Sequence, residues 1–447
     1  MQLTIEKLIY GGDGLARVPA AGDERRGKTV FISGVLPGEI VEARAVEERK
    51  GYTRAEVVEI IAPSPERVAP ACPHYERCGG CHYQHLSYPA QLEAKKQILR
   101  ETILRGARVE LPEITVHSAE PWAFRNRTRM KITPGTEFAI GYHGRGSHEL
   151  EPVRECPISS PLINRALSLL WQMQSELAAC ESLREVQFFA NHDDSGLRIE
   201  FFIHHATRPA ELAEVTRAIR ERMPEVVGVA VFATGGAGED ADDASLESTR
   251  LLTRAGKPFI DGADALPYKV GNFSYQVSAG GFFQTNRHLT QRLVEIVAGG
   301  RKGHAALDLY AGGGLFTLPL AAVFEKVTAV EVAPVSYHDL VRNVPRHGVR
   351  TVESTTEDFL RTARAGWDFV VADPPRAGLG ERTARLLAGL KAPRVVLVSC
   401  DPATLSRDLP ALVTAGYQVE AAHIVDLFPQ TYHMESVLHL VRAAKPD

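Results

Sequence analysis

Cys400 is the side chain with the most reactive chemistry in an informative position. It follows an apolar run over residues 394–399 and precedes Asp401 and Pro402, where a helical pattern begins. The partial positive charge at a helix N-terminus lowers the pKa of a nearby thiol and favours the thiolate. The position therefore predicts a nucleophile, although a single cysteine at a strand end also fits an inert core thiol.

Two candidate bases lie in the segment 428–435, which reads Phe-Pro-Gln-Thr-Tyr-His-Met-Glu. Glu435 and His433 both belong to the residue types that move protons in catalysis. A covalent reaction at Cys400 needs such a group to complete the turnover. Spacing alone also fits two solvated surface side chains.

A glycine-rich segment over 308–316 follows an apolar strand and opens a helix, in the order Asp-Leu-Tyr-Ala-Gly-Gly-Gly-Leu-Phe. Glycines such as Gly312 let the backbone approach a ligand, and a helix N-terminus favours negative charge. The next strand ends in Glu331, about twenty residues further on, where an acid binds ribose hydroxyls in such folds. This pattern fits a dinucleotide, S-adenosylmethionine or a glycine turn without a ligand.

Asp373 ends a third apolar strand and is followed by Pro374, Pro375 and Arg376. Proline fixes φ, so the backbone after this carboxylate is held in place. Because Asp373 comes at the same sheet edge as Gly312 and Glu331, we interpret it as part of one ligand site. A buried structural carboxylate is the alternative.

Four cysteines form a separate candidate site. Cys72, Cys78 and Cys81 cluster around a diglycine, and Cys156 precedes a proline. Four thiolates hold a [4Fe–4S] cluster or a zinc ion, whereas disulfides are rare in a reducing compartment. Ligation by four cysteines leaves no open iron, which favours a structural role.

The elements that position these residues divide the 447-residue chain into three expected domains. Alternating apolar residues over 1–62 predict a small β-barrel, a type that often binds oligonucleotides, and Pro63 and Pro65 end it. A mixed α/β domain is expected over 63–265, in which residues 87–120 are candidates to pack on the domain that follows. An acidic tract over 236–248 is predicted to be a solvated loop.

Residues 266–447 show strands alternating with helices. Strands are expected at 304–310, 327–332, 369–372 and 394–400, with helices over 335–348 and 402–416. This alternation predicts a doubly wound parallel sheet that binds its ligand at the carboxyl ends of the strands. The last two apolar runs, 418–428 and 436–444, should pair antiparallel at the sheet edge.

The composition is that of a globular protein, with 44% hydrophobic and 24% charged residues and a formal net charge of −4. No apolar run is long enough to span a membrane and no secretory signal is visible, so a cytoplasmic protein is expected. No obligate protein partner is evident. The alternating cations Arg125, Arg127, Arg129 and Lys131 would project from one strand face, either to phosphates or to solvent.

These motifs together resemble the RumA/TrmA family of RNA 5-methyluridine methyltransferases, in the branch with a TRAM domain and an iron–sulfur cluster. Phe283-Gln284-Thr-Asn resembles the family's FFQ-x-N motif, and Ser399-Cys400-Asp-Pro its nucleophile motif. The resemblance implies cluster ligands at Cys72, Cys78, Cys81 and Cys156. It implies cofactor contacts at Gln284, Tyr310, Glu331 and Asp373, alongside Gly312, and a catalytic base at Glu435.

The family resemblance implies an α/β protein with a Rossmann-like class I methyltransferase domain. An OB-like TRAM barrel would precede it, and a central α+β domain would hold the cluster. The implied reaction is S-adenosylmethionine-dependent formation of 5-methyluridine in 23S ribosomal RNA. The target uridine would leave its stack and form a covalent adduct between C6 and Cys400. A T-loop uridine of transfer RNA is the alternative substrate, and a non-catalytic RNA-binding or assembly protein is the alternative class.

Two positions depart from the family pattern. Leu315 stands where the glycine turn often carries an asparagine, so a side-chain contact from that asparagine is not available. Asp401 replaces the usual asparagine after the nucleophile. Its negative charge is expected to raise the pKa of the Cys400 thiol.

Overall fold

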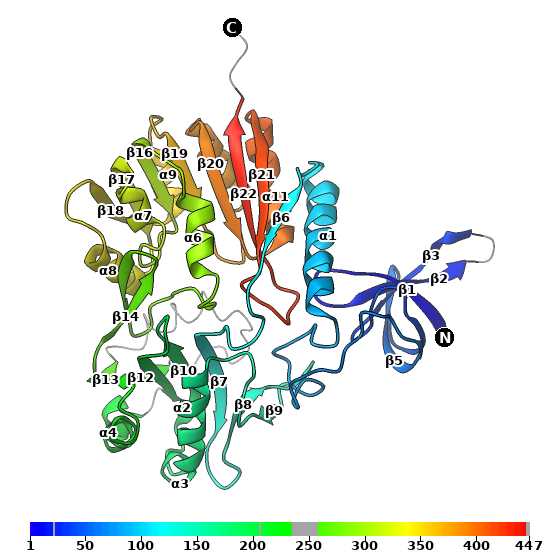
Figure 1. Cartoon of the computed structure of the whole chain (residues 1–447), viewed down its shortest axis with the longest axis horizontal. Helices are drawn as coiled ribbons and strands as arrows, with labels where there is room; N and C mark the ends of the chain where they lie inside the picture. Colours follow the sequence, from blue (N-terminus) through cyan, green and yellow to red (C-terminus); the bar gives the residue numbers. More distant parts are fainter. Residues whose placement is uncertain (21–22, 205–206, 235–257, 444–447) are drawn as a thin grey trace.

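The computed structural model describes residues 1–20, 23–204, 207–234 and 258–443. The described residues form a barrel, two larger sheets and a two-stranded hairpin, and Figure 1 shows the N-terminal barrel to one side of a central sheet and a larger C-terminal sheet. The acidic tract at 236–248 lies outside the described residues, so its prediction as a loop stays a prediction.

The barrel confirms the expectation for residues 1–62. Its strands are β1 (Gln2–Leu8), β2 (Gly14–Ala20), β3 (Asp23–Ile32), β4 (Ile40–Glu48) and β5 (Tyr52–Ala62). They close in the order β1-β2-β3-β5-β4. Buried and exposed residues alternate over the first part of β1, and Leu3 and Ile5 pack with Val30 and Ile32 in the barrel core. The period-two pattern of the sequence is therefore the inside–outside alternation of a closed sheet.

The central sheet has the strand order β13-β12-β11-β10-β7-β8-β9. Its strands are β7 (Arg127–Thr133), β8 (Ala139–His143), β9 (Leu150–Pro152), β10 (Leu183–Ala190), β11 (Leu197–His204), β12 (Val226–Thr234) and β13 (Phe259–Gly262). The helical elements are α2 (Pro161–Gln172), α3 (Gln174–Ala178), the 3-10 turn η1 (Pro209–Leu212) and α4 (Ala213–Arg222). Helix α2 packs its apolar side, including Leu167 and Leu170, into the same core as Phe188 and Phe201.

The C-terminal sheet has eight strands in the order β18-β17-β16-β19-β20-β22-β21-β6. The strands are β6 (Ile114–His117), β16 (Gly303–Leu309), β17 (Phe324–Glu331), β18 (Val349–Glu353), β19 (Phe369–Ala372), β20 (Arg394–Ser399), β21 (Tyr417–Val425) and β22 (Glu435–Arg442). The helices are α6 (Thr290–Ala298), α7 (Thr317–Ala321), α8 (Pro334–Asn343), α9 (Thr356–Thr362), α10 (Glu381–Gly389) and α11 (Pro402–Thr414). A two-stranded hairpin, β14 (Ala265–Val270) and β15 (Phe273–Ser278), precedes this sheet.

The predicted doubly wound sheet is confirmed. Strand β16 pairs in parallel with β17 on one side and with β19 on the other. The chain thus reverses its direction of travel across the sheet between β18 and β19, and ligands bind at the carboxyl ends of strands beside such a switch point.

The edge of this sheet differs from the prediction. β21 and β22 do pair antiparallel, but β22 is inserted between β20 and β21, and β6 takes the edge by pairing in parallel with β21. Helix α1 (Tyr88–Ala107), which precedes β6 in the chain, packs against α11 (Figure 1). This packing brings β6 next to β21 at the edge of the sheet. A Cβ atom on Gly106 of α1 would lie 1.9 Å from Ser406 Oγ, so the two helices meet closely there.

A buried ion pair ties α1 to the loop after β21. Lys95 Nζ donates to Asp426 Oδ1 at 2.6 Å and to the carbonyl of Phe428 at 2.9 Å. Tyr88 donates its hydroxyl proton to the other oxygen of Asp426 at 2.9 Å. The Lys95 and Asp426 side chains are both 0% exposed, and burial lowers the pKa of Lys95. Removal of one partner would leave the other charge buried without compensation.

Lys95→Met is therefore expected to lower the free energy of unfolding by about 3 kcal/mol or more, because Asp426 loses its buried counter-ion. Urea denaturation followed by circular dichroism measures the change. Lys96→Met is the matched control, since Lys96 pairs with the largely exposed Glu113 and its loss should cost less than about 1 kcal/mol. Equal effects of the two substitutions would contradict a stabilising role for the buried pair.

Candidate active site

The loop after β16 has a conformation that few sequences adopt. Tyr310 has φ 61°, and Gly312 and Gly314 have φ 55° and 93°. A tyrosine in the left-handed region is uncommon and is found where the surroundings impose it. Glycine accepts the same region without strain, which explains two of the three glycines of this turn.

Glu331, the last residue of β17, shapes that loop. Its Oε2 accepts a hydrogen bond from the backbone N–H of Gly312 at 2.8 Å. Its Oε1 accepts from Val332 at 2.8 Å and from Ala333 at 2.6 Å. The predicted proximity of the glycine turn and the acid is therefore present, and Glu331 is already held in place by three backbone donors.

Two carboxylates lie next to this loop, Asp308 fully buried and Asp373 partly buried. Burial raises the pKa of Asp373, directly after β19, to about 7. Burial also raises the pKa of Asp308 in β16 to about 7, and the charge of Asp373 adds to this effect. Thr317 donates to Asp308 Oδ2 at 2.5 Å, while Oδ1 has no hydrogen-bond partner among the described residues. Asp308 is not among the predicted site residues, because nothing in its local pattern distinguishes it from other residues of the strand.

Cys400 lies directly after β20 and before α11, as predicted. Asp401 is the N-cap of α11, and its Oδ1 accepts from the N–H groups of Ala403 at 2.8 Å and Thr404 at 3.0 Å. The carboxylate that replaces the family's asparagine therefore performs the capping role that either residue can fill.

The expectation of a lowered thiol pKa is wrong for the ligand-free protein. Burial raises the pKa of Cys400 well above its ordinary value, and the charges of Glu435, Asp373 and Asp401 raise it further. Arg376 acts in the opposite direction. The helix N-terminus does not dominate, because three carboxylates surround a thiol from which water is largely excluded. The direction expected from the Asp401 departure is confirmed.

Glu435 is the first residue of β22 and is 3% exposed. Burial and the charge of Asp373 raise its pKa, and its Oε1 has no hydrogen-bond partner in the part of the chain that the structure describes. Since Ser399 pairs with Ser436 across the two strands, Cys400 and Glu435 come to the same edge of the sheet. A buried carboxylate with a raised pKa beside a thiol is suited to proton transfer.

His433, the other candidate base, has a lowered pKa, whereas that of Glu435 is raised. Burial lowers the pKa of His433 to about 3, and the charge of Arg376 contributes. The imidazole is therefore neutral and only weakly basic at neutral pH, which favours Glu435 as the base.

Gln284 lies in the segment between the β14–β15 hairpin and helix α6. Gln284 is 7% exposed, and Phe283 packs against Tyr268 and Tyr275 of the hairpin. Asn286 donates through Nδ2 to the carbonyl of Leu427 at 3.1 Å. The segment that follows the hairpin is thus hydrogen-bonded to the loop that leads to Glu435.

Leu315 is 8% exposed and belongs to the apolar core next to the hairpin. Its carbonyl accepts from the hydroxyl of Tyr275 at 3.0 Å. The residue that departs from the family pattern therefore has a packing role and a backbone contact.

The predicted row of cations makes contacts within the protein. Arg127 Nη1 donates to the carbonyl of Gly281 at 2.7 Å, and its guanidinium lies over the ring of Phe189. Arg129 and Lys131 pair with Glu185 of the neighbouring strand, and the Lys131 side chain is 40% exposed. A role of this row in binding phosphates stays a prediction.

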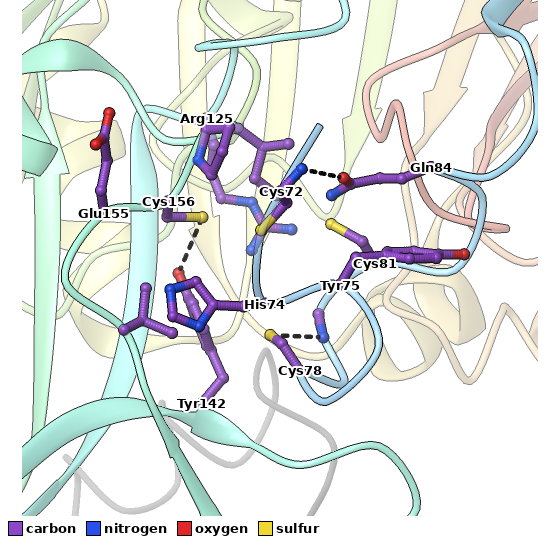
Figure 2. Close-up of a pocket in the computed structure, with 14 residues that line it drawn as sticks. Cys72, His74, Tyr75, Cys78, Cys81, Gln84, Arg125, Tyr142, Glu155 and Cys156 are labelled. Carbon is purple, nitrogen blue, oxygen red and sulfur yellow. Dashed lines mark hydrogen bonds between the residues drawn. The ribbon is translucent and has the colours of Figure 1, made fainter. Parts of the chain in front are cut away.

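The cysteine cluster is brought together by the fold. Cys72, Cys78, Cys81 and Cys156 line one pocket, together with Gln84, Arg125 and Tyr142 (Figure 2). Burial raises the pKa of Cys78 to about 11 and that of Cys81 to about 12. Among the described residues, no three or more His, Cys, Asp or Glu side chains form a group that could hold a single metal ion.

The cysteine loop contacts the loop that carries the candidate base. The backbone N–H groups of His82 and Tyr83 both donate to the carbonyl of Gln430, at 2.8 and 2.9 Å. Gln430 has φ 66°, and Gln91 of α1 donates to its side chain at 3.0 Å. Residues next to Cys81 therefore help to hold Gln430 in an otherwise strained conformation.

The strand order, the glycine turn after the first parallel strand and the acid at the end of the second define a doubly wound α/β protein with a ligand site at its switch point. A family model described as tRNA (Uracil-5-)-methyltransferase matches residues 256–443, and a TRAM domain model matches residues 1–58. No helix of the described part is long and apolar enough to cross a membrane.

Curated relatives match nearly the full length of the chain. A protein of Aquifex aeolicus named an uncharacterized RNA methyltransferase is 32% identical and covers 98% of this chain and 97% of its own. The 23S rRNA (uracil(1939)-C(5))-methyltransferase of Chromohalobacter salexigens is 32% identical, over 98% and 89% of the two chains.

A solved structure shows the same fold over the whole molecule. It is the Pyrococcus abyssi tRNA (uracil-54, C5)-methyltransferase in complex with S-adenosyl-L-homocysteine. The TM-score is 0.74 at 23% identity, with 99% of this chain and 100% of that chain covered.

The chain belongs to the TRAM-domain family of tRNA and rRNA uracil-5-methyltransferases. It is an S-adenosylmethionine-dependent RNA (uracil-5-)-methyltransferase whose substrate is an RNA uridine.

Proposed function

We propose that this enzyme forms 5-methyluridine in 23S ribosomal RNA, with Cys400 as the covalent nucleophile and Glu435 as the base. The observation that carries the mechanism is that Cys400 directly follows β20 and Glu435 begins the adjacent strand β22, at the same sheet edge as Asp373. The ribosomal substrate is supported by the Chromohalobacter salexigens relative, which is named as a 23S rRNA methyltransferase and matches 98% of this chain.

The chemistry requires a thiol because C5 of uracil is a weak nucleophile. Addition of the Cys400 sulfur to C6 moves electron density to C5, which then takes the methyl group from the donor. Glu435 removes the proton that C5 still carries. The C6–S bond breaks as the double bond re-forms, and Cys400 leaves as a thiolate.

Because the pKa of Cys400 is raised, a positive charge near its sulfur is needed to stabilise the thiolate. S-Adenosylmethionine supplies a methyl group on a positively charged sulfur when bound, and that charge favours the thiolate. Arg376 acts in the same direction from the protein side. Binding of the donor is therefore expected to activate the nucleophile.

Five residues are proposed to hold the methyl donor. Gln284, Tyr310, Gly312, Glu331 and Asp373 lie at the carboxyl edge of the sheet or in the segment packed beside it. The fit rests on the donor set, because Glu331 has a fixed carboxylate for ribose hydroxyls and Gly312 allows a close approach of the backbone. Tyr310 contributes an aromatic side chain from a left-handed backbone position.

The four cysteines of the pocket are proposed to hold a [4Fe–4S] cluster. The proposal is supported by the four thiols that line one pocket, because a [4Fe–4S] cluster takes one thiolate on each iron. Zinc, which also takes four thiolates, is the alternative. The cluster would stabilise the loop whose next residues, His82 and Tyr83, hold Gln430.

A uridine of transfer RNA is the second candidate substrate, because the solved structure with the same overall fold is named as a tRNA (uracil-54, C5)-methyltransferase. A non-catalytic RNA-binding role is less well supported, since candidate nucleophile and base are both present. The relatives named for 23S rRNA are more similar in sequence than the tRNA enzyme, at 32% against 23% identity.

The substrate is tested by methylation of unmodified 23S rRNA and unmodified transfer RNA with labelled S-adenosylmethionine. We expect methyl transfer to 23S rRNA at a rate at least about tenfold above that to tRNA, a difference of about 1.4 kcal/mol in transition-state stabilisation. Mass spectrometry of RNA fragments then locates the 5-methyluridine. Transfer to tRNA alone would overturn the ribosomal assignment and leave the chemistry in place.

The roles of the two reactive side chains are tested together. Cys400→Ala should abolish methyl transfer and the covalent RNA adduct, because no sulfur is available to add to C6. Glu435→Gln should permit methyl transfer but accumulate an adduct that survives denaturing electrophoresis, because the C5 proton is not removed. Cys180→Ala and Glu420→Gln are matched controls at a half-buried and an exposed position, and both should retain turnover. Turnover by Cys400→Ala would refute the mechanism.

The metal centre is tested on protein purified without oxygen. Iron and acid-labile sulfide are each expected at about four per chain. Cys81→Ala should lose most of both, whereas Cys180→Ala, whose thiol donates to the carbonyl of Glu176, should keep them. One zinc per chain in place of iron would show that the assignment is wrong.

A further inference from the structure

A tyrosine of the N-terminal barrel reaches the nucleophile. Tyr10 lies in the turn after β1, where Ile9 N–H donates to the carbonyl of Asp13 at 2.9 Å and Gly12 N–H to the carbonyl of Ile9 at 3.2 Å. Its hydroxyl donates to Asp401 Oδ2 at 3.2 Å and lies 3.4 Å from the carbonyl oxygen of Cys400. The partners are 390 and 391 residues further along the chain.

The Asp401 carboxylate connects this contact to the helix that follows the nucleophile. Its Oδ1 accepts from Ala403 and Thr404 at the start of α11, whereas Oδ2 faces Tyr10. Both oxygens therefore have partners. The turn is closed from the other side by Ser399, whose Oγ donates to the carbonyl of Asp401 at 3.0 Å. Tyr10 contacts this turn from a different domain, the N-terminal barrel.

The turn that carries Tyr10 packs against the loop between β21 and β22, which contains Tyr432. A Cβ atom on Gly12 would lie 3.2 Å from the ring of Tyr432 and 3.4 Å from His82. The rings of Tyr10 and Tyr432 meet edge to face, with centroids 5.4 Å apart. Only a residue without a side chain permits so close an approach, and Gly12 also has φ 94°. The position of Tyr10 is thus determined by packing as well as by its hydrogen bonds.

We propose that Tyr10 is a positioning residue for the nucleophile, through which the barrel completes the active site in addition to any contact it makes with RNA. Its hydroxyl holds the Cys400–Asp401 turn, and its proton partly neutralises the Asp401 carboxylate next to the thiol. Burial and the neighbouring Asp401 raise the pKa of Tyr10, so the hydroxyl stays protonated and acts as a donor. This inference rests on the proposed role of Cys400.

Loss of the hydroxyl should change the pH dependence of adduct formation. The groups whose charges act on Cys400 are Glu435, Asp373, Asp401 and Arg376, and Tyr10 is the donor that faces Asp401. Without that donor the Asp401 charge acts more strongly on the thiol, so the thiolate forms at higher pH. The rate of adduct formation, which rises with pH as thiolate forms, should therefore shift to higher pH in Tyr10→Phe.

The experiment compares Tyr10→Phe, which keeps the ring and its packing on Tyr432, with Tyr52→Phe, a barrel tyrosine whose ring contacts Phe31. Single-turnover methyl transfer and adduct formation are measured at saturating RNA and S-adenosylmethionine, across pH, with RNA affinity measured separately by filter binding. Tyr10→Phe is expected to lower both rates by about three- to tenfold, as for the loss of one typical hydrogen bond. RNA affinity should change by less than about twofold, and Tyr52→Phe should behave as wild type.

Two results would overturn the proposal. One is an unchanged rate and pH profile in Tyr10→Phe. The other is weaker RNA binding with an unchanged rate at saturation, which would make Tyr10 an RNA contact. Failure of the proposed function is separately visible, because the wild-type enzyme and Glu435→Gln would then form no adduct. The methyl-transfer rate of Tyr10→Phe would still report on Tyr10 in that case.

Discussion

The insertion of β22 between β20 and β21 is the constraint on which the active site depends. β20 runs parallel to β19, so Cys400 and Asp373 leave the sheet at the same edge. β22 runs antiparallel to β20, so its first residue, Glu435, also starts at that edge. With β22 parallel to β20, the thiol and the base would lie at opposite ends of the sheet, more than about 15 Å apart for strands of this length.

That arrangement concentrates acidic groups in a place from which water is largely excluded. Asp308 and Glu435 are buried and Asp373 is partly buried; all three have raised pKa values, and the thiol of Cys400 is affected by two of them. Each negative charge makes the next one harder to form. A positively charged methyl donor would fit such a site, because its charge stabilises the ionised carboxylates. In the proposed mechanism the same charge would also favour the thiolate of Cys400.

The loop that carries the base is held from three other parts of the chain. The buried pair of Lys95 and Asp426 joins it to α1, and Asn286 joins it to the hairpin segment. The cysteine loop holds Gln430 through two backbone donors. A cluster in the cysteine pocket would therefore stabilise the cysteine loop, which contacts the segment that leads to Glu435. The barrel adds a contact through the ring of Tyr10 on Tyr432.

The amino-acid sequence by itself determined the local features of this protein. Period-two alternation predicted the barrel, strand–helix alternation predicted the doubly wound sheet, and strand ends indicated Glu331, Asp373 and Cys400 as candidate site residues. Such features depend on residues close together in the chain, where backbone geometry relates spacing to position. Tertiary structure alone decided the direction of the Cys400 pKa shift, the pairing of Arg129 and Lys131 with Glu185, the place of β6 at the sheet edge and the contact of Tyr10. Each of these depends on solvent exclusion and on charges from segments as far as 390 residues away, which no local pattern contains.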